Sequence, residues 1–311
     1  MCTAVAYKQR YFGRNLDYDC SFGESVVITQ RAFPFLFPEG QALQKHYAII
    51  GIAHVSENYP LYYDAMNEKG LAMAGLLFGG NAVYHQPVAG KENIPSWGFI
   101  PWVLGQCSSV SEAEKILLRL NLTDVSFSEA LPPAPLHWMI ADRERSIVVE
   151  STADGLHVYE NPTGVLTNNP PFPFHLENLN QYLNLTAEEP ENRFSEKIDL
   201  KPFSRGMGAL GLPGDLSSVS RFIRAAFVRS HSLSEEKGDV SQFYHILGAV
   251  EQQRGCVHLG KGRYEMTIYS SCCDLEQRVY YWKIYDNYCI QKLELMGEKL
   301  DGSGLQWVQI G

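Results

Sequence analysis

The chain has 311 residues, of which 45% are hydrophobic and 20% are charged, values typical of a globular protein with a sizeable core. Its formal net charge of −9, without a basic stripe, argues against a nucleic-acid-binding protein. No apolar run approaches the roughly 20 residues of a membrane span and no signal peptide is apparent, so we expect no membrane insertion. The seven cysteines are odd in number and lack CxxC spacing, which favours a reduced, cytoplasmic protein.

Alternating apolar and β-branched residues predict strands in the N-terminal part of the chain. These strands cover residues 2–7, 11–19, 25–31, 46–55 and 62–78. A helix is predicted to begin near Ser109, because Ser109 and Glu112 form a capping-box pattern ahead of an apolar run.

The second half of the chain continues with strands, two helices and a final hairpin. Strands are predicted at 137–151, 155–161 and 164–169, and helices at 217–230 and 241–255, the latter stopped by Gly255. A long hairpin is predicted at 263–287. This block order does not fit regular βαβ alternation. It predicts an α+β fold, with antiparallel sheets sandwiched between helical layers. No linker divides the chain, so we expect one domain over residues 1–311.

Cys2 is the first candidate for chemistry. Only Met1 precedes it, and small residues follow, a start that aminopeptidases trim. A mature chain beginning at Cys2 would carry a thiol nucleophile and an α-amine base on one residue. The alternative is an incidental cysteine in a frayed N-terminus.

The predicted N-terminal hairpin brings Arg14 and Asp17 back towards Cys2. Arg14 would stabilise a thiolate, and Asp17 would orient the α-amine. The alternative for this pair is a solvent-exposed ion pair at the end of a strand.

Two later segments offer polar groups. Asn168 and Asn169 end an apolar strand, where an asparagine amide would serve as an oxyanion donor, although an ordinary strand-to-turn exit is the alternative. Arg221 lies in the first turns of a predicted helix, where the helix dipole disfavours a cation, which suggests a separate use such as binding a carboxylate. The alternative is a solvated arginine.

Histidines supply a different type of site. His137, His175 and His245 are alternatives for a cysteine–histidine dyad, although His137 fits better as a hydrogen-bonded core residue. The nine histidines form no HExxH motif and no paired Cys/His ligand set, so we expect neither a metal nor a cofactor.

Taken together, these segments resemble the choloylglycine hydrolase family of N-terminal-nucleophile hydrolases, which contains bile salt hydrolases and penicillin V acylases. The segments are MCTAVA, FGRNLD, MNEKGLAMAGL, LHWMIADRERSIVVES, GVLTNNPPF, GLPGDLSSVSRFIRAAF and YEMTIYSSCC, in that order along nearly the whole chain. The resemblance is closer to bile salt hydrolases. It implies a four-layer αββα sandwich and a homotetramer.

Positions in the family motifs imply roles for residues of this chain. Cys2 falls on the nucleophile, Arg14 and Asp17 on the pair beside it, Asn168 on the oxyanion asparagine with Asn169 as the alternative, and Arg221 on a later active-site arginine. The backbone N–H of Leu77 falls on the second oxyanion donor. Bile salt hydrolases usually have asparagine at this place, so Leu77 keeps the N–H but puts the substrate preference in doubt.

The expected activity is cleavage of the amide between a bile acid and glycine or taurine, through a thioester on Cys2. Penicillin V or another N-acyl amide is the alternative substrate. The sequence also leaves open a non-catalytic binder of apolar ligands and a papain-like Cys–His hydrolase. Apolar side chains are expected to line the substrate pocket, namely Leu16, Phe22, Phe127 and Leu131.

Overall fold

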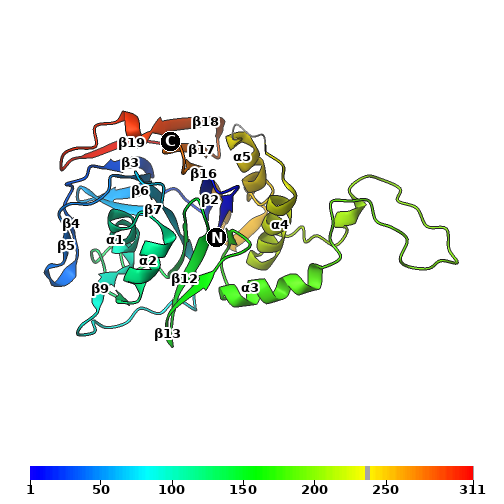
Figure 1. Cartoon of the computed structure of the whole chain (residues 1–311), viewed down its shortest axis with the longest axis horizontal. Coiled ribbons are helices and arrows are strands. Elements are labelled where there is room, and N and C mark those ends of the chain that lie inside the picture. The colour runs from blue at the N-terminus through cyan, green and yellow to red at the C-terminus, as the bar shows by residue number, and fades with distance from the viewer. Residues whose placement is uncertain (235–238, 311) are drawn as a thin grey trace.

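The computed structural model describes residues 1–234 and 239–310. Two large antiparallel sheets face each other in its centre (Figure 1). The first has seven strands, in the order β14-β1-β2-β16-β17-β18, with β15 also paired to β16. Its strands are β1 (Cys2–Tyr7), β2 (Tyr11–Tyr18), β14 (Val165–Leu166), β15 (Val257–Gly260), β16 (Arg263–Asp274), β17 (Val279–Ile284) and β18 (Asn287–Glu294).

The second sheet has eight strands, in the order β13-β12-β11-β8-β7-β6-β3-β19. They are β3 (Ser25–Thr29), β6 (Ile49–Ser56), β7 (Tyr59–Asn67), β8 (Ala72–Leu77), β11 (Leu136–Ala141), β12 (Ser146–Thr152), β13 (Gly155–Glu160) and β19 (Leu305–Gln309). Two short pairs lie outside the main sheets: β4 (Phe35–Leu36) with β5 (Ala42–Leu43), and β9 (Glu92–Pro95) with β10 (Leu120–Thr123).

Helices cover the outer face of each sheet. Helix α1 (Phe99–Gln106) packs on β6, β7 and β8, with α2 (Val110–Leu117) in the same apolar cluster. On the other side, α4 (Ser218–His231) packs on β1 and β14, and α5 (Val240–Gly248) packs on β1, β2 and β16. The short α3 (Phe172–Asn178) adjoins α4. The predicted four-layer α+β sandwich is therefore confirmed. No helix within residues 1–234 and 239–310 is long and apolar enough to cross a membrane.

The first two strands form the predicted hairpin, and they determine where Cys2 lies. Lys8 and Gln9 make the turn with φ values of 51° and 54°, so β1 ends at Tyr7. In the register, Cys2 lies opposite Leu16. Because β14 flanks β1 on its other edge, the N-terminal strand is held from both sides rather than frayed.

The helix predictions are correct in position but not in every boundary. Ser109 caps α2 as expected, because its side chain accepts a hydrogen bond from the Glu112 N–H. Helix α5 ends at Gly248, so the expected stop at Gly255 is wrong. The main chain of Gln252 is instead hydrogen-bonded to Thr267 on β16, so the chain has left the helix before Gly255.

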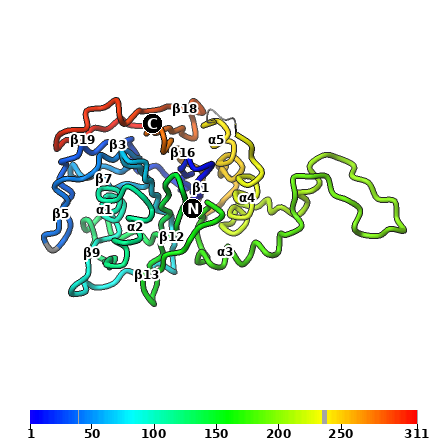
Figure 2. Tube along the Cα trace, in the orientation of Figure 1, coloured from blue at the N-terminus to red at the C-terminus, as the bar shows by residue number. Residues whose placement is uncertain are grey.

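An arm formed by residues 183–216 leaves the sandwich between α3 and α4. Figure 2 shows it as the long loop that projects from the body of the molecule. It contains no strand, and its regular structure is a single 3-10 turn at Met207–Ala209. Several of its apolar side chains are largely exposed, namely Leu183, Phe194, Phe203 and Leu210.

Candidate active site

The site begins at the buried end of β1, where Arg14 on the neighbouring strand reaches Cys2. Arg14 Nη2 donates to Cys2 Sγ, and its Nη1 donates to the carbonyl oxygens of Gly75 at 2.5 Å and Tyr63 at 3.3 Å. Arg14 is fully buried and Cys2 is nearly so. Burial works to lower the pKa of Arg14, but neighbouring groups, with Cys2 first among them, raise it above its usual value. A permanent cation therefore contacts the thiol.

Asn168 connects three parts of the site. Its Oδ1 accepts hydrogen bonds from the main-chain nitrogen of Cys2 and from Arg221 Nη2, both at 2.8 Å. Its Nδ2 donates to the carbonyl of Leu77 at 2.7 Å. Within the described part of the chain, that donation uses one of the two amide hydrogens, so the other remains able to donate to a developing oxyanion.

The main chain of Asn168 is fixed as firmly as its side chain. Its N–H donates to Ser218 Oγ at 2.8 Å, and its carbonyl lies 2.9 Å from His175 Nε2. Ser218 lies at the start of α4 and His175 lies on α3. Two helices thus hold the asparagine in place.

Arg221 projects from the first turns of α4 into the same cluster. Its Nη1 donates to the Cys2 carbonyl and to Thr3 Oγ1, each at 2.6 Å. Asp17 lies 3.9 Å away. Burial lowers the pKa of Arg221, and the charges of Asp17 and Cys2 oppose that effect. The arginine is fully buried, so the solvated alternative does not apply.

The Asp17 carboxylate is held by two polar side chains. It accepts hydrogen bonds from Thr267 Oγ1 at 2.6 Å and from Gln252 Nε2 at 3.2 Å. Its main chain pairs with Met1, whose ammonium donates to the Asp17 carbonyl at 2.7 Å and also contacts the Glu265 carboxylate. Burial raises the pKa of Asp17, and Arg221 is the largest opposing influence. With Met1 in place, the Cys2 nitrogen is a peptide nitrogen.

Leu77 ends β8 with its main chain turned towards Asn168. Its partner across the ladder, Leu136, donates its N–H to Tyr84 Oη, while the adjacent Phe78 N–H bonds the Pro135 carbonyl. Hydrogen-bonded and non-bonded pairs alternate in antiparallel sheets, so Leu77 belongs to a non-bonded pair. Its N–H therefore points away from β11, to the side where its carbonyl meets Asn168.

The four predicted pocket residues lie on two segments of the chain. Leu16 lies directly opposite Cys2. Phe22 is exposed and packs on Tyr18. The Phe127 ring packs on Tyr59 and Trp97, and its main chain is bonded to Leu131. No ring contact or hydrogen bond among the described residues joins Phe127 or Leu131 to Cys2, so their role stays a prediction.

The histidines are placed for structure. His137 lies 3.0 Å from Glu150 Oε1 and 2.9 Å from the Thr167 carbonyl, as expected for a bonded core residue. Burial lowers the pKa of His175 to about 4. In the part of the chain that the structure describes, no histidine is hydrogen-bonded to Cys2 Sγ. The geometry therefore does not support a cysteine–histidine dyad.

Several residues that hold the site carry no signal of that role in the sequence. Four of them bond to members of the site, yet they come from β1, the loop after α5, β16 and α4, namely Thr3, Gln252, Thr267 and Ser218. The pattern around Ser218 indicates only a helix start. No local pattern around Gln252 or Thr267 distinguishes them, because their use depends on the pairing of distant segments.

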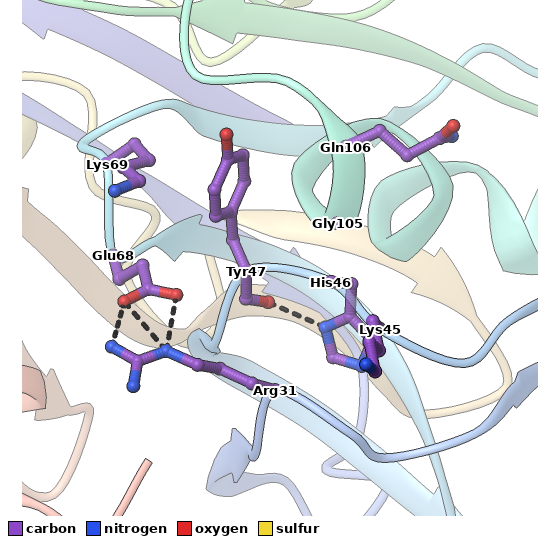
Figure 3. Close-up of a pocket in the computed structure, with 8 residues that line it drawn as sticks. All are labelled: Arg31, Lys45, His46, Tyr47, Glu68, Lys69, Gly105 and Gln106. Carbon is purple, nitrogen blue, oxygen red and sulfur yellow. Dashed lines mark hydrogen bonds and ion pairs between the residues drawn. The ribbon is translucent and has the colours of Figure 1, made fainter. Parts of the chain in front are cut away.

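A separate cavity of about 630 Å³ lies away from this cluster (Figure 3). Two of its lining residues, Arg31 and Glu68, form an ion pair, and the Lys69 ammonium lies 5.2 Å from the centre of the Tyr47 ring. Its lining residues are Arg31, Lys45, His46, Tyr47, Glu68, Lys69, Gly105 and Gln106. It shares no residue with the Cys2 cluster, and no cysteine, serine or threonine is among its lining residues.

Comparisons with known proteins agree with this geometry. Residues 2–307 match the model of the family described as linear amide C–N hydrolases, choloylglycine hydrolase family. A bile salt hydrolase/transferase from Lactiplantibacillus plantarum is 56% identical over 98% of this chain and 95% of its own. A second bile salt hydrolase/transferase, from Clostridium perfringens, is 39% identical over 98% of this chain and 96% of its own.

Solved structures give the same result. A C2A variant of the conjugated bile acid hydrolase from Clostridium perfringens superposes with a TM-score of 0.94 at 38% identity, over 100% of this chain and 97% of that one. Penicillin V acylase from Agrobacterium tumefaciens shares the fold, with a TM-score of 0.77 at 17% identity, over 100% and 92% of the two chains. The chain is an enzyme of the choloylglycine hydrolase family, whose members hydrolyse linear amide C–N bonds.

Proposed function

We propose that this enzyme is a conjugated bile salt hydrolase, which cleaves the amide between a bile acid and glycine or taurine. The observation that carries the proposal is the contact of Arg14 with Cys2 Sγ, beside an asparagine that bonds the Cys2 nitrogen. The identity of 56% to a protein named bile salt hydrolase/transferase supports the substrate class. A non-catalytic binder would not need a cation fixed against a buried thiol.

The reaction begins after removal of Met1, which converts the Cys2 nitrogen from an amide into an α-amine. The Cys2 thiolate, stabilised by Arg14, attacks the amide carbonyl. The Leu77 N–H and Asn168 Nδ2 stabilise the tetrahedral oxyanion. The C–N bond then breaks, and the leaving amine takes a proton from the α-ammonium of Cys2. Water cleaves the resulting thioester, and Cys2 is restored.

Asp17 and Arg221 act around the nucleophile in this proposal. Arg221 holds the Cys2 carbonyl and Asn168 Oδ1, so it fixes the main chain of the nucleophile relative to the oxyanion donor. Asp17 balances the charge of Arg221 and of the new α-ammonium. Leu16, Phe22, Phe127 and Leu131 are proposed to contact the apolar part of the substrate.

Penicillin V remains the second candidate substrate, because Leu77 presents an apolar, partly exposed side chain beside the oxyanion site.

A thioester intermediate also allows an amine to replace water as the acceptor. The names of the two bacterial relatives, which include transferase, support that activity for this chain.

We also propose that the chain is one catalytic domain that assembles as a homotetramer in a reducing, cytoplasmic compartment. The arm of residues 183–216 supports the assembly, because Phe194 and Phe203 are 82% and 90% exposed on a segment that projects from the fold. The compartment is supported by the cysteines, which are all unpaired.

The deciding experiment compares release of glycine, taurine and phenoxyacetate from glycine-conjugated bile salt, taurine-conjugated bile salt and penicillin V. Intact-mass measurement on the same sample establishes whether Met1 has been removed. We expect bile salts to be hydrolysed faster than penicillin V by a chain that begins at Cys2. Arg14→Leu should abolish turnover, whereas the matched surface variant Arg143→Leu should retain it. Faster turnover of penicillin V, or full activity with Met1 retained, would contradict the proposal.

A further inference from the structure

Asp64 is a buried carboxylate to which neither the sequence motifs nor the proposed reaction assigns a role. It lies on β7 and is fully buried between the two sheets. Three hydroxyl groups donate to it: Tyr269 Oη at 2.6 Å, Ser271 Oγ at 2.9 Å and Tyr280 Oη at 2.5 Å. All three donors belong to the opposite sheet. A buried charge destabilises a fold unless it is compensated, and these three donors supply part of that compensation.

Ser271 connects this carboxylate to the active site. The Ser271 hydroxyl donates to Asp64 Oδ2 and accepts the main-chain N–H of Arg14 at 3.3 Å. The approach is close, because β2 and β16 meet at Gly13, where an added Cβ would overlap the Ser271 carbonyl. Asp64 thus orients the hydroxyl that receives the Arg14 main chain.

The guanidinium of Arg14 is anchored in the same neighbourhood. Its Nη1 donates to the carbonyl of Tyr63, the residue immediately before Asp64, and to Gly75 on β8. No ion pair joins Arg14 directly to a carboxylate within residues 1–234 and 239–310. Carbonyl oxygens and Cys2 Sγ hold this side chain, so a carboxylate can balance its charge only from beyond these direct contacts.

Electrostatics supports Asp64 as that counter-charge. Burial raises the pKa of Asp64, and Arg14 is the largest opposing influence, ahead of the three hydroxyl donors. Asp64 is in turn among the groups that raise the pKa of Arg14. Each group therefore stabilises the ionised form of the other inside the sandwich.

We propose that Asp64 is a positioning residue of this hydrolase, which holds Arg14 against the Cys2 thiol through Ser271 and the Tyr63 main chain. Asp64 is fully buried and accepts three hydrogen bonds, so it acts through Arg14 rather than on substrate. The inference rests on the proposed function only in taking Cys2 as the nucleophile. Loss of this support should lower the reactivity of Cys2 and kcat while KM changes little.

Two variants separate positioning from simple stability. Ser271→Ala and Tyr280→Phe each remove one donor to the same oxygen of Asp64, but only Ser271 also bonds Arg14. We expect Ser271→Ala to lower kcat and the rate of Cys2 alkylation by iodoacetamide about 10-fold, the scale of a small misplacement of a catalytic group. Both values should stay within about 2-fold of wild type in Tyr280→Phe. Ser271→Thr keeps the hydroxyl group, so it should retain the wild-type values.

The measurements use the full chain below the Tm of every variant, with alkylation followed by mass spectrometry of the Cys2 peptide. Asp64→Asn should lower kcat and the rate of Cys2 alkylation more than Ser271→Ala does. If Asp64→Asn does not fold, Ser271→Ala tests the proposal in its place. Equal losses in Ser271→Ala and Tyr280→Phe, or wild-type values in Ser271→Ala, would overturn the proposal. Alkylation needs no substrate, so it tests Asp64 even if bile salts prove not to be hydrolysed.

Discussion

The side-chain oxygen of Asn168 accepts a hydrogen bond from the main-chain nitrogen of Cys2 at 2.8 Å, although 166 residues separate them. The same oxygen is bonded by Arg221, while the amide nitrogen holds the Leu77 carbonyl. One side chain therefore fixes the N-terminus of the nucleophile and presents a donor to the oxyanion. The oxygen and the nitrogen of its amide have different roles. We therefore expect an alanine substitution to lower activity far more at Asn168 than at the neighbouring Asn169.

Asn168→Ala should lower kcat by about 100- to 1,000-fold, the usual effect of removing one oxyanion donor. Steady-state hydrolysis of a conjugated bile salt measures this. Asn169→Ala is the matched control, because Asn169 Nδ2 donates to Gly79 rather than to the Cys2 cluster. A larger loss in Asn169→Ala would transfer the oxyanion role to that residue.

Cys2→Ser should lower turnover by about 1,000-fold or more, because a serine hydroxyl beside Arg14 is far less ionised than a thiol. Intact mass must show that Met1 is removed from both proteins. Cys20→Ser is the control: it replaces an exposed cysteine and should remain active and sensitive to iodoacetamide. Full activity in Cys2→Ser would refute the thioester mechanism.

His175 should make the fold less stable in mild acid. Its pKa is about 4 in the folded chain against 6.5 usually, so between these values the unfolded chain binds a proton that the folded chain does not. Above pH 6.5 the neutral His175 takes nothing from the free energy of unfolding. As pH falls from 6.5 to about 4, that free energy decreases by about 3 kcal/mol.

Urea unfolding of wild type and His175→Gln at a series of pH values tests this. Glutamine keeps a donor for the Asn168 carbonyl but does not titrate. The difference between the two proteins isolates His175 from the buried carboxyl groups, whose raised pKa values act in the opposite direction. The same pH slope in both proteins would contradict the expectation. Activity at pH 7 should persist in His175→Gln, since no histidine serves as a base.

We expect the arm of residues 183–216 to hold the proposed tetramer together. Replacing Phe194 and Phe203 with serine removes its two most exposed aromatic rings, so light scattering should show smaller assemblies. Leu118→Ser is the control, because Leu118 is 77% exposed but lies at the end of α2. A tetramer that survives the double substitution would assign its interface to another surface.

The local parts of this fold were predictable from sequence. The hairpin of β1 and β2, the Ser109 cap and the hairpin of β16 and β17 all depend on patterns within a few residues. Helix α1 was not predictable in the same way, because it is apolar on nearly every face and contains Pro101. A proline near the start of a helix is tolerated, since its missing N–H would have no partner there.

The residues of the site also differ in how far the sequence predicts them. Arg14 and Asp17 were predicted from their hairpin, whereas their partners could be identified only in the tertiary structure. The expectation that Asp17 orients the α-amine of Cys2 stays a prediction, and the structure adds Thr267 and Gln252 as partners of its carboxylate. Asp64 interrupts an apolar strand, which is a signal in the sequence, although its three donors come from the other sheet.

The position of β1 between β14 and β2 has a practical consequence for recombinant work. Most chains tolerate a purification tag at the amino end, since that end is loose. Here the first strand is an interior member of a sheet, and Met1 already touches Asp17 and Glu265. A tag fused to the N-terminus would have to pass these contacts of Met1, and it would keep the Cys2 nitrogen acylated. Any such fusion must be cut so that cysteine becomes the first residue.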